Sequence, residues 1–381
     1  MIGGGKSAFV GAIHRIAARM DNEYELVCGV FNRKPKYSSL TGKELGLDQT
    51  RIYGSYQELF EKEKQLPEAE RMEVVAIVTP NHVHAEPAIL AMQNGFHVIM
   101  DKPISLDLAE AFQIRKVAEL TESLFCLTHT YTGYPLVKEA RDIIKTGKLG
   151  AIRKIYVEYP QGWLSTPLEL TGNKQARWRS DPKRSGKGGA LGDIGTHAFN
   201  LAEFVTGLAV THICADVNKV VNGRVLDDDA SVLLKFSNGA SGLLSSTQVA
   251  AGEENNISIR VYGENGGICW QQNDANSLIL KWKDRPTEIL RAGNNMSYLS
   301  PNTLHNCRTP AGHPEGYLEA FANHYRNFAL AVKARQRGIK PHFEWTDYPG
   351  IEDGVRGMAF IETAVRSGKS KEKWLKLRVD N

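Results

Sequence analysis

The sequence lacks the features that mark secreted, membrane-spanning or nucleic-acid-binding proteins. Its five cysteines are scattered without a closely spaced pair, which favours reduced thiols over a disulfide framework. No apolar run approaches the roughly 20 residues of a membrane helix, and no basic, apolar leader opens the chain. The net charge of +4 is small and evenly spread, unlike that of a nucleic-acid-binding chain. We therefore expect a cytoplasmic protein with no membrane or nucleic-acid partner.

The composition is typical of a globular protein with more than one domain. The chain has 381 residues, of which 42% are hydrophobic and 24% charged. In the first third, short runs rich in valine and isoleucine alternate with helix-period stretches, which indicates βαβ units. The expected strands are 25–31, 73–79, 97–100 and 124–128. The expected helices are 12–20, 56–64, 84–94 and 108–122.

From about residue 150, long strands joined by tight turns replace this alternation. Asn238-Gly239 separates two strand-like runs, which is a strong hairpin signal, and the turn at 264–267 gives another. Segment 286–314 is expected to be a long loop. The last helices are expected at 313–334 and 349–367, and the final one could pack back on the first domain.

These patterns predict an α/β protein with two domains. Residues 1–130 should form a Rossmann domain with a doubly wound parallel sheet. Residues 131–381 should form an α+β domain with a large, mostly antiparallel open sheet. Few residues stand before the first glycines, so we expect the first strand to be truncated and the natural start to lie upstream of Met1.

A glycine-rich segment opens the chain and leads into a helix. A dinucleotide-binding turn needs glycines where the backbone approaches the pyrophosphate, and helix N–H groups that point at it. Gly3 and Gly5 fit the first two positions of that turn, but the third glycine, Gly11, comes three residues late. Phe9 lies in the resulting insertion, residues 6–10. The motif is weak by itself, and an ordinary glycine-rich turn is the alternative.

The end of the second expected strand bears on the choice of cofactor. NAD enzymes often carry an acidic residue there, which accepts hydrogen bonds from the adenosine ribose. This chain has Asn32 and Arg33 instead, so a 2′-phosphate would be tolerated or preferred. We expect NAD(P) as the cofactor, with a leaning to NADP. The alternative is that Arg33 is an ordinary solvated residue.

Two polar segments follow neighbouring strands at the edge where ligands bind open α/β sheets. Asp101 and Lys102 follow strand 97–100, and a proline fixes the chain directly after them. A lysine in an apolar cleft loses part of its preference for charge and so suits proton transfer, although a surface lysine is an equal alternative. In the preceding segment the candidate cofactor contacts are Thr79, Pro80, Asn81 and His84. Asn81 could also cap a helix.

A second polar centre lies on a helix expected over 192–206. Asp193 and His197 are four residues apart and so share a helix face. A histidine beside a carboxylate is a common general base, oriented by that carboxylate. The alternatives are a dipole-favoured Asp193 near the helix start, or a metal site, for which further ligands at suitable spacing are missing. Trp178 and Arg179 could flank a nicotinamide or pack a domain junction.

Together these segments resemble the glucose–fructose oxidoreductase / inositol dehydrogenase / MocA family over essentially the whole chain. The glycine entry, TPNHVH at 79–84, DKP at 101–103, Trp178-Arg179 and GDIGTH at 192–197 occur in the family's order. Three features depart from its pattern. Asp101 stands where the family usually has glutamate, the glycine turn carries an insertion, and an arginine usual after the last parallel strand is missing.

The resemblance implies an NAD(P)-dependent enzyme that transfers a hydride to or from a secondary hydroxyl or carbonyl of a sugar, cyclitol or related polyol. It implies that Lys102, Asp193 and His197 line the reacting site, and that the open sheet forms a homodimer or homotetramer. We expect His197 to take the hydroxyl proton, Asp193 to orient His197, and Lys102 to stabilise the alkoxide or relay the proton. No metal is expected.

Polar and aromatic side chains suited to sugar faces and hydroxyls supply the candidate substrate shell. They are Tyr131, Gln161, Trp163, Arg177 and His305. Ordinary loop packing is the alternative for each. Two other functions stay open. One is a glycoside-cleaving enzyme that uses tightly bound NAD in a transient oxidation–elimination cycle, and the other is a dinucleotide-binding regulatory protein.

Overall fold

The computed structural model describes residues 1–6 and 8–379, and the chain forms two compact units. The first unit holds Met1–His129 and Phe321–Val355, and the second holds Thr130–Ala320 and Arg356–Asn381. Helices α11 (Tyr317–Gln336) and α12 (Ile351–Lys369) carry the chain from one unit to the other and confirm the two expected final helices, with shifted ends. Ser7, in the expected insertion, lies outside the described residues. Over the ranges described, no helix has the length and apolar character needed to cross a membrane.

The first unit contains a parallel sheet in the order β1-β2-β3-β4. Its strands are β1 (Ile2–Gly3), β2 (Val74–Val78), β3 (His97–Met100) and β4 (Phe125–Leu127). Its helices before residue 130 are α1 (Phe9–Met20), α2 (Pro35–Glu44), α3 (Tyr56–Glu63), α4 (Ala85–Gln93) and α5 (Leu108–Thr121). Val75, Ile77 and Val98 are fully buried, as in parallel strands covered on both faces. The expected Rossmann sheet is confirmed.

One expected strand, 25–31, is wrong as a full strand. Only Gly29 and Val30 make ladder pairs, with Ile52 and Ile2 respectively. The reason is that β1 is two residues long, so it offers this segment a single point of pairing. Helix α2 follows directly and was not predicted, because its sequence is mostly polar. A proline in its first turn presets the helical φ angle.

Glycines are required at the entry to α1 because backbone segments meet there. Gly3 and Gly4 have φ angles of +87° and +72°, in the left-handed region. A Cβ on Gly5 would lie 2.6 Å from the carbonyl oxygen of Phe31, and one on Gly11 would lie 2.2 Å from the Cα of Gly4. Gly11 therefore allows the close helix packing that the third glycine of a dinucleotide turn provides, despite its unusual spacing.

The second unit contains a large mixed sheet in the order β12-β11-β10-β9-β5-β8-β7-β6-β13. In the described part of this sheet, neighbouring strands are antiparallel except β5 and β8, which run parallel. The strands are β5 (Lys154–Pro160), β6 (Val210–Asn218), β7 (Asp229–Phe236), β8 (Ser241–Thr247), β9 (Ser258–Tyr262), β10 (Gly266–Gln271), β11 (Ser277–Trp282), β12 (Glu288–Arg291) and β13 (Trp374–Lys376). The expected α+β domain and both expected hairpins are confirmed.

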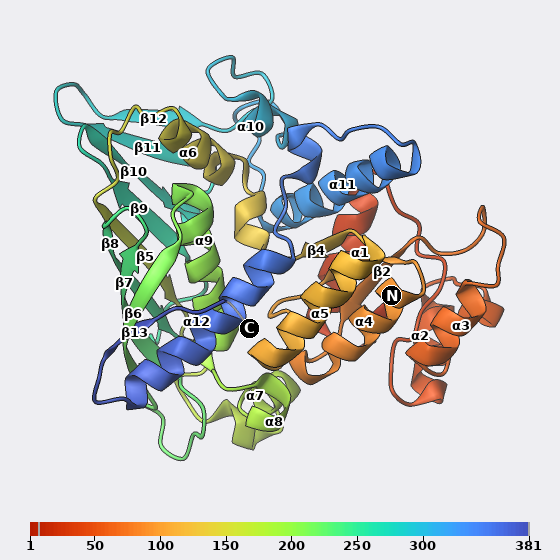
Figure 1. Ribbon diagram of the computed structural model, residues 1–381. Coiled ribbons are helices and arrows are strands. Elements are labelled where there is room, and N and C mark those ends of the chain that lie inside the picture. The colour runs from red at the N-terminus through yellow and green to blue at the C-terminus, as the bar shows by residue number, and fades with distance from the viewer. Residues whose placement is uncertain (7, 380–381) are drawn as a thin grey trace. The chain divides into compact units, whose positions relative to one another are not determined.

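Helices α6 (Pro135–Lys145) and α9 (Thr196–Thr206) cover one face of this sheet (Figure 1). The second half of α12 packs beside α9, where the rings of Phe199 and Phe360 stack with centroids 4.6 Å apart. The remaining short helices of this unit are α7 (Lys174–Arg179), α8 (Pro182–Ser185) and α10 (Pro301–His305). Burial alternates along β5, so that Ile155 faces these helices and Tyr156 lies on the opposite, half-exposed face.

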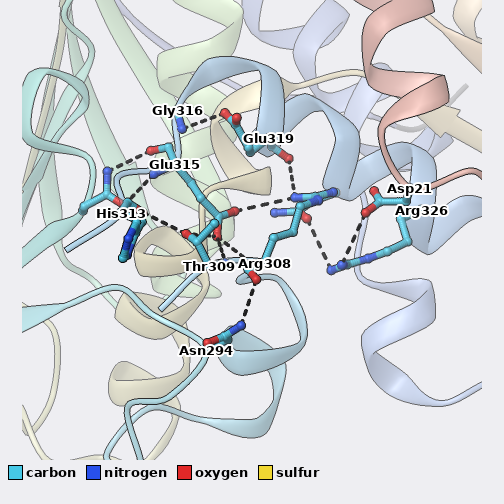
Figure 2. A network of polar contacts seen from close by, with 11 residues as sticks. Asp21, Asn294, Arg308, Thr309, His313, Glu315, Gly316, Glu319 and Arg326 are labelled. Atoms are coloured by element: carbon cyan, nitrogen blue, oxygen red, sulfur yellow. Dashed lines mark hydrogen bonds and ion pairs between the residues drawn. The ribbon is translucent and has the colours of Figure 1, made fainter. Parts of the chain in front are cut away.

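Segment 286–314, expected as a loop, contains two short elements, β12 and α10. The buried carboxylate of Glu315 binds the last part of this segment (Figure 2). It accepts hydrogen bonds from the backbone nitrogens of Arg308 (2.5 Å) and Thr309 (2.8 Å), and lies 3.7 Å from the Arg308 guanidinium. These hydrogen bonds of Glu315 fix the chain between the edge of the sheet and the start of α11.

Candidate active site

A π-helical turn, Leu191–Gly195, precedes α9 and carries Asp193. The buried carboxylate of Asp227 fixes the start of this turn by accepting hydrogen bonds from the backbone nitrogens of Gly189 (2.7 Å) and Leu191 (2.8 Å). Gly189 is required because a Cβ there would lie 2.0 Å from the Asp227 carbonyl oxygen. The expected helix is confirmed, and its first turn is wider than an α-helical turn. Such turns are frequent at functional sites.

Asp193 lies in a polar setting of charged and amide groups. Its Oδ2 accepts hydrogen bonds from Arg179 Nε (3.2 Å) and from Gln248 Nε2 (2.9 Å). Arg179 is held in turn by Gln175, whose Oε1 accepts from Nη1 at 2.7 Å, and its guanidinium lies over the Trp178 ring at 4.3 Å. The structure therefore places Trp178 and Arg179 beside Asp193 within the second unit.

His197 is buried at the start of α9, with 9% of its surface exposed. Tyr131 meets it edge to face, with ring centroids 5.0 Å apart. The Tyr131 and Tyr159 hydroxyls share a hydrogen bond, and both contact the Asn255 side-chain amide. Burial raises the pKa of Tyr131 and of Tyr159 well above the ordinary range, so both phenols keep their protons at physiological pH.

Gln161 joins these two groups of contacts. Its Nε2 donates to Asn255 Oδ1 at 2.5 Å, and its Oε1 accepts from Trp163 Nε1 at 3.0 Å and from Gln248 Nε2 at 3.3 Å. A continuous chain of amide and phenol groups therefore runs from Asp193 to the ring that contacts His197. We call Tyr131, Tyr159, Gln161, Gln248 and Asn255 the amide–phenol network.

The network contains residues that the sequence did not indicate: Tyr159, Gln248 and Asn255. The parallel pairing of β5 with β8 explains one of them, Gln248. Pro160 pairs with Thr247, so Gln161 and Gln248 leave the sheet side by side. A purely antiparallel sheet would not place Gln248 beside Gln161, so the sequence did not indicate Gln248.

The other two expected substrate-shell residues of the second unit are Arg177 and His305. Arg177 is exposed and lines a surface hollow with Lys174, Trp178, Asp181 and Arg184. His305 ends α10, whose N-cap, Ser300, is bound to α6 through Glu139 and Asp142. A substrate role for Arg177 or His305 stays a prediction.

In the first unit, Asp101 and Lys102 follow β3, as expected. Asp101 Oδ1 accepts from the backbone nitrogen of Lys102 at 3.0 Å and from Thr128 Oγ1 at 3.3 Å. Thr79 and Pro80 follow β2, and the buried Asn81 opens a 3₁₀ turn, Asn81–Val83, instead of capping α4. These loops occupy the carboxyl ends of neighbouring parallel strands, the usual ligand side of such a sheet.

Among the described residues, no side chain caps the N-terminus of α1 at the glycine entry. Ala8, the N-cap of α1, has no side-chain oxygen, so its side chain does not occupy the first-turn N–H groups of the helix. Phe9 is exposed to 66%, and Asn32 and Arg33 are exposed where the adenosine ribose of a dinucleotide would be recognised. The residues present therefore fit a dinucleotide. Over the described ranges, no group of three or more His, Cys, Asp or Glu side chains could hold a metal ion.

Several buried histidines of the first unit lie near Asp101 or Lys102. His14 Nδ1 lies 2.7 Å from the Tyr325 hydroxyl, and its Nε2 has no hydrogen-bond partner. Burial lowers the pKa of His14 to about 4 and that of His129 to about 3. Both rings are therefore neutral at physiological pH.

We expect His14 to make the protein sensitive to acid. Because its folded pKa is depressed from 6.5 to about 4, the unfolded chain binds the extra proton between these values. The stabilisation is complete above pH 6.5 and is lost as the pH falls toward 4, by up to about 1.4 kcal/mol per pH unit. Urea unfolding of wild type and His14→Asn across this range should show their difference in unfolding free energy shrink with acid. The exposed His313→Asn variant is the control, and a pH-independent difference for His14→Asn would contradict the expectation.

Comparison with known proteins gives matches over the whole chain. Residues 1–129 match the family described as "Oxidoreductase family, NAD-binding Rossmann fold", and residues 137–269 match "GFO/IDH/MocA C-terminal domain". The uncharacterized oxidoreductase YfiI of Bacillus subtilis (strain 168) is 32% identical over 381 residues, which cover 99% of this chain and 96% of that protein.

Solved structures agree in fold and length. An oxidoreductase from Sinorhizobium meliloti is 43% identical, with a TM-score of 0.88, over 99% of this chain and 98% of that chain. An inositol dehydrogenase homologue from Azotobacter vinelandii, complexed with NAD+, is 34% identical, with a TM-score of 0.92, over 99% and 96%. The same homologue complexed with NADH and myo-inositol is 33% identical, with a TM-score of 0.89, over 99% and 96%.

Proposed function

Since the chain belongs to the GFO/IDH/MocA family of NAD-binding oxidoreductases, we propose that it transfers a hydride between nicotinamide and a secondary hydroxyl or carbonyl of an uncharged sugar, cyclitol or related polyol. The observation that carries this proposal is the amide–phenol network beside Asp193 and His197. Amides and protonated phenols donate and accept hydrogen bonds without charge, as the hydroxyls of a polyol require. The nearby cation, Arg179, is balanced by Asp193.

In the proposed reaction, bound NAD(P) supplies the hydride acceptor or donor. His197 takes the proton of the reacting hydroxyl, or returns it in the reverse direction. Asp193, held by Arg179 and Gln248, provides the negative charge that favours the protonated imidazole. Lys102, from the first unit, stabilises the alkoxide or relays the proton. Gln161 and Asn255 orient the remaining hydroxyls of the substrate.

The first substrate to test is myo-inositol, because the Azotobacter homologue has been seen complexed with it and with NADH. A panel of inositols, sugars and anhydrosugars should be assayed by the near-ultraviolet absorbance of reduced nicotinamide, with NAD and NADP in parallel. Turnover without release of reduced cofactor would favour the oxidation–elimination cycle. Tight cofactor binding with no turnover on any member of the panel would favour a regulatory protein.

For the cofactor, we propose that NADP is accepted beside NAD, with Arg33 as the group that contacts a 2′-phosphate. The segment after Phe31 exposes Asn32 and Arg33 and carries no carboxylate. Arg33→Gln is expected to raise KM for NADP by about tenfold or more and to change KM for NAD by less than about threefold. Lys36→Gln, an exposed change nearby, is the control. An equal change in both KM values would contradict the role of Arg33.

The protein is proposed to act in the cytoplasm as a homodimer or homotetramer, formed through the outer face of the large sheet. That face carries half-exposed Tyr156, Tyr262 and Leu243 beside the exposed Leu233. No disulfide joins the five cysteines, all of which the structure describes, as suits a reducing compartment. Light scattering after gel filtration measures the mass, and a monomer would contradict the assembly. Leu233→Asp should lower the mass if this face is used.

A further inference from the structure

His84 is buried between the loops that follow β2 and β3, with 1% of its surface exposed. Its Nε2 lies 2.7 Å from the carbonyl oxygen of Thr79, and its Nδ1 lies 2.7 Å from the carbonyl oxygen of Pro103. Both ring nitrogens therefore face backbone carbonyls. The sequence suggested that His84 contacts the cofactor, but its hydrogen-bonding groups are directed into the protein.

The two carbonyls belong to the loops proposed to hold the nicotinamide side of the cofactor and the reacting lysine. Thr79 stands directly after β2, and Pro103 directly follows Lys102. On its other side, Lys102 is fixed by the bond from its backbone nitrogen to Asp101 Oδ1. Thr128, after β4, donates to the same oxygen. Hydrogen bonds therefore hold the main chain on both sides of Lys102. His84 makes the contact on the C-terminal side, at Pro103.

We propose that His84 is a positioning residue that sets the placement of Lys102 relative to the Thr79 loop. This proposal rests on the proposed function, because it assigns Lys102 to the reaction. A shift of about 1 Å in a reacting group can cost about 100-fold in rate, so a link of this kind has a measurable effect.

The ring meets two acceptors, whereas a neutral imidazole has one N–H. Burial lowers the pKa of His84 below its ordinary value, although both carbonyls and the nearby Asp101 act in the opposite direction. Lys102 and the neutral His14 also face this region, and Lys102 further disfavours the protonated ring. In its neutral form the ring therefore donates its one proton to a single carbonyl. The proposal assigns that proton to Nδ1, which donates to Pro103, while the other edge of the ring packs against Thr79. Substitution tests this assignment.

Asn and Gln each place an amide nitrogen where one of the two ring nitrogens of His84 lies. The Asn amide nitrogen lies where Nδ1 does and can still donate to Pro103, whereas the Gln amide nitrogen reaches the position of Nε2 and can still donate to Thr79. His84→Gln is expected to lower kcat by about 100-fold and to leave KM for the cofactor within about threefold. His84→Asn, which keeps the donor to Pro103, is expected to keep both kcat and KM for the cofactor within about threefold.

The exposed His82, two residues earlier in the same loop, offers matched controls: His82→Gln and His82→Asn should change neither constant by more than about twofold. Thermal unfolding shows whether each variant is folded. Equal loss of kcat in both His84 variants, or no loss in either, would overturn the proposal.

A measurement on the cofactor-free protein does not depend on turnover. Nitrogen-15 NMR of the histidine rings should show a His84 N–H that exchanges slowly with water and disappears in both His84 variants. Rapid exchange would overturn the proposal whatever the activity. A slowly exchanging ring proton in a protein that turns over no polyol would count against the proposed function and leave the contact between the loops intact.

Discussion

Replacing Lys102 by Met or His197 by Ala should abolish turnover while leaving cofactor binding nearly intact. A positioned acid or base contributes about 10²–10⁴-fold to rate, so each change should lower kcat by at least the smaller factor. The cofactor is expected to be held mainly by the glycine entry and the loops after β2 and β3, which neither substitution removes. Initial rates give kcat, and quenching of tryptophan fluorescence gives the cofactor Kd.

Two variants away from the site control for general damage. Lys116→Met removes an exposed lysine from α5, and His313→Ala removes an exposed imidazole from the second unit. Both should retain wild-type rates. Wild-type rates in both Lys102→Met and His197→Ala would refute the assignment of the reacting groups. Loss of cofactor binding with loss of rate would instead assign Lys102 a binding role.

Gly189→Ala should lower the free energy of unfolding on the order of 3–5 kcal/mol, the range of severe core changes. The added Cβ would meet the Asp227 carbonyl oxygen at 2.0 Å, a backbone atom that cannot turn away. Moving it would also disturb the bonds from Gly189 and Leu191 to the Asp227 carboxylate, which is buried and would lose its partners. The same movement would shift the turn that carries Asp193, so kcat should fall in whatever protein remains folded.

The same turn provides a matched control for stability. Beyond its chain neighbours and the backbone of its own helix, a Cβ on Gly192 would meet no atom within 4 Å, so Gly192→Ala should change the unfolding free energy by less than about 1 kcal/mol. Urea unfolding of both variants measures the difference. Equal destabilisation by the two alanines would show that the contact between Gly189 and Asp227 is not the cause.

The sequence predicts the polar centres of this protein better than their surroundings. The spacing of Asp193 and His197 predicts that they share a helix face, whereas the π-helical turn depends on Asp227, which is distant in sequence. Tyr131 and Gln161 are recognisable as sugar-binding types. Gln248 and Asn255 are not, because their place depends on strand pairing.

The parallel sheet of the first unit also contains features that a local sequence pattern does not predict. The apolar run at 25–31 has the composition of a buried strand but makes only isolated pairs, since the two residues of β1 give it one point of contact. His84 carries no signal of its inward orientation either. Its two carbonyl partners, at Thr79 and Pro103, come from loops that only the folded sheet brings together.

The central claim is that Asp193, His197 and Lys102 carry out hydride transfer on a polyol. The most direct measurement is the transfer of deuterium from a carbon-deuterated inositol to NAD, followed by mass spectrometry of the nicotinamide. Wild-type protein should form deuterated NADH, and His197→Ala and Lys102→Met should form almost none in the same time. Deuterated NADH at the wild-type rate in both variants would contradict the claim.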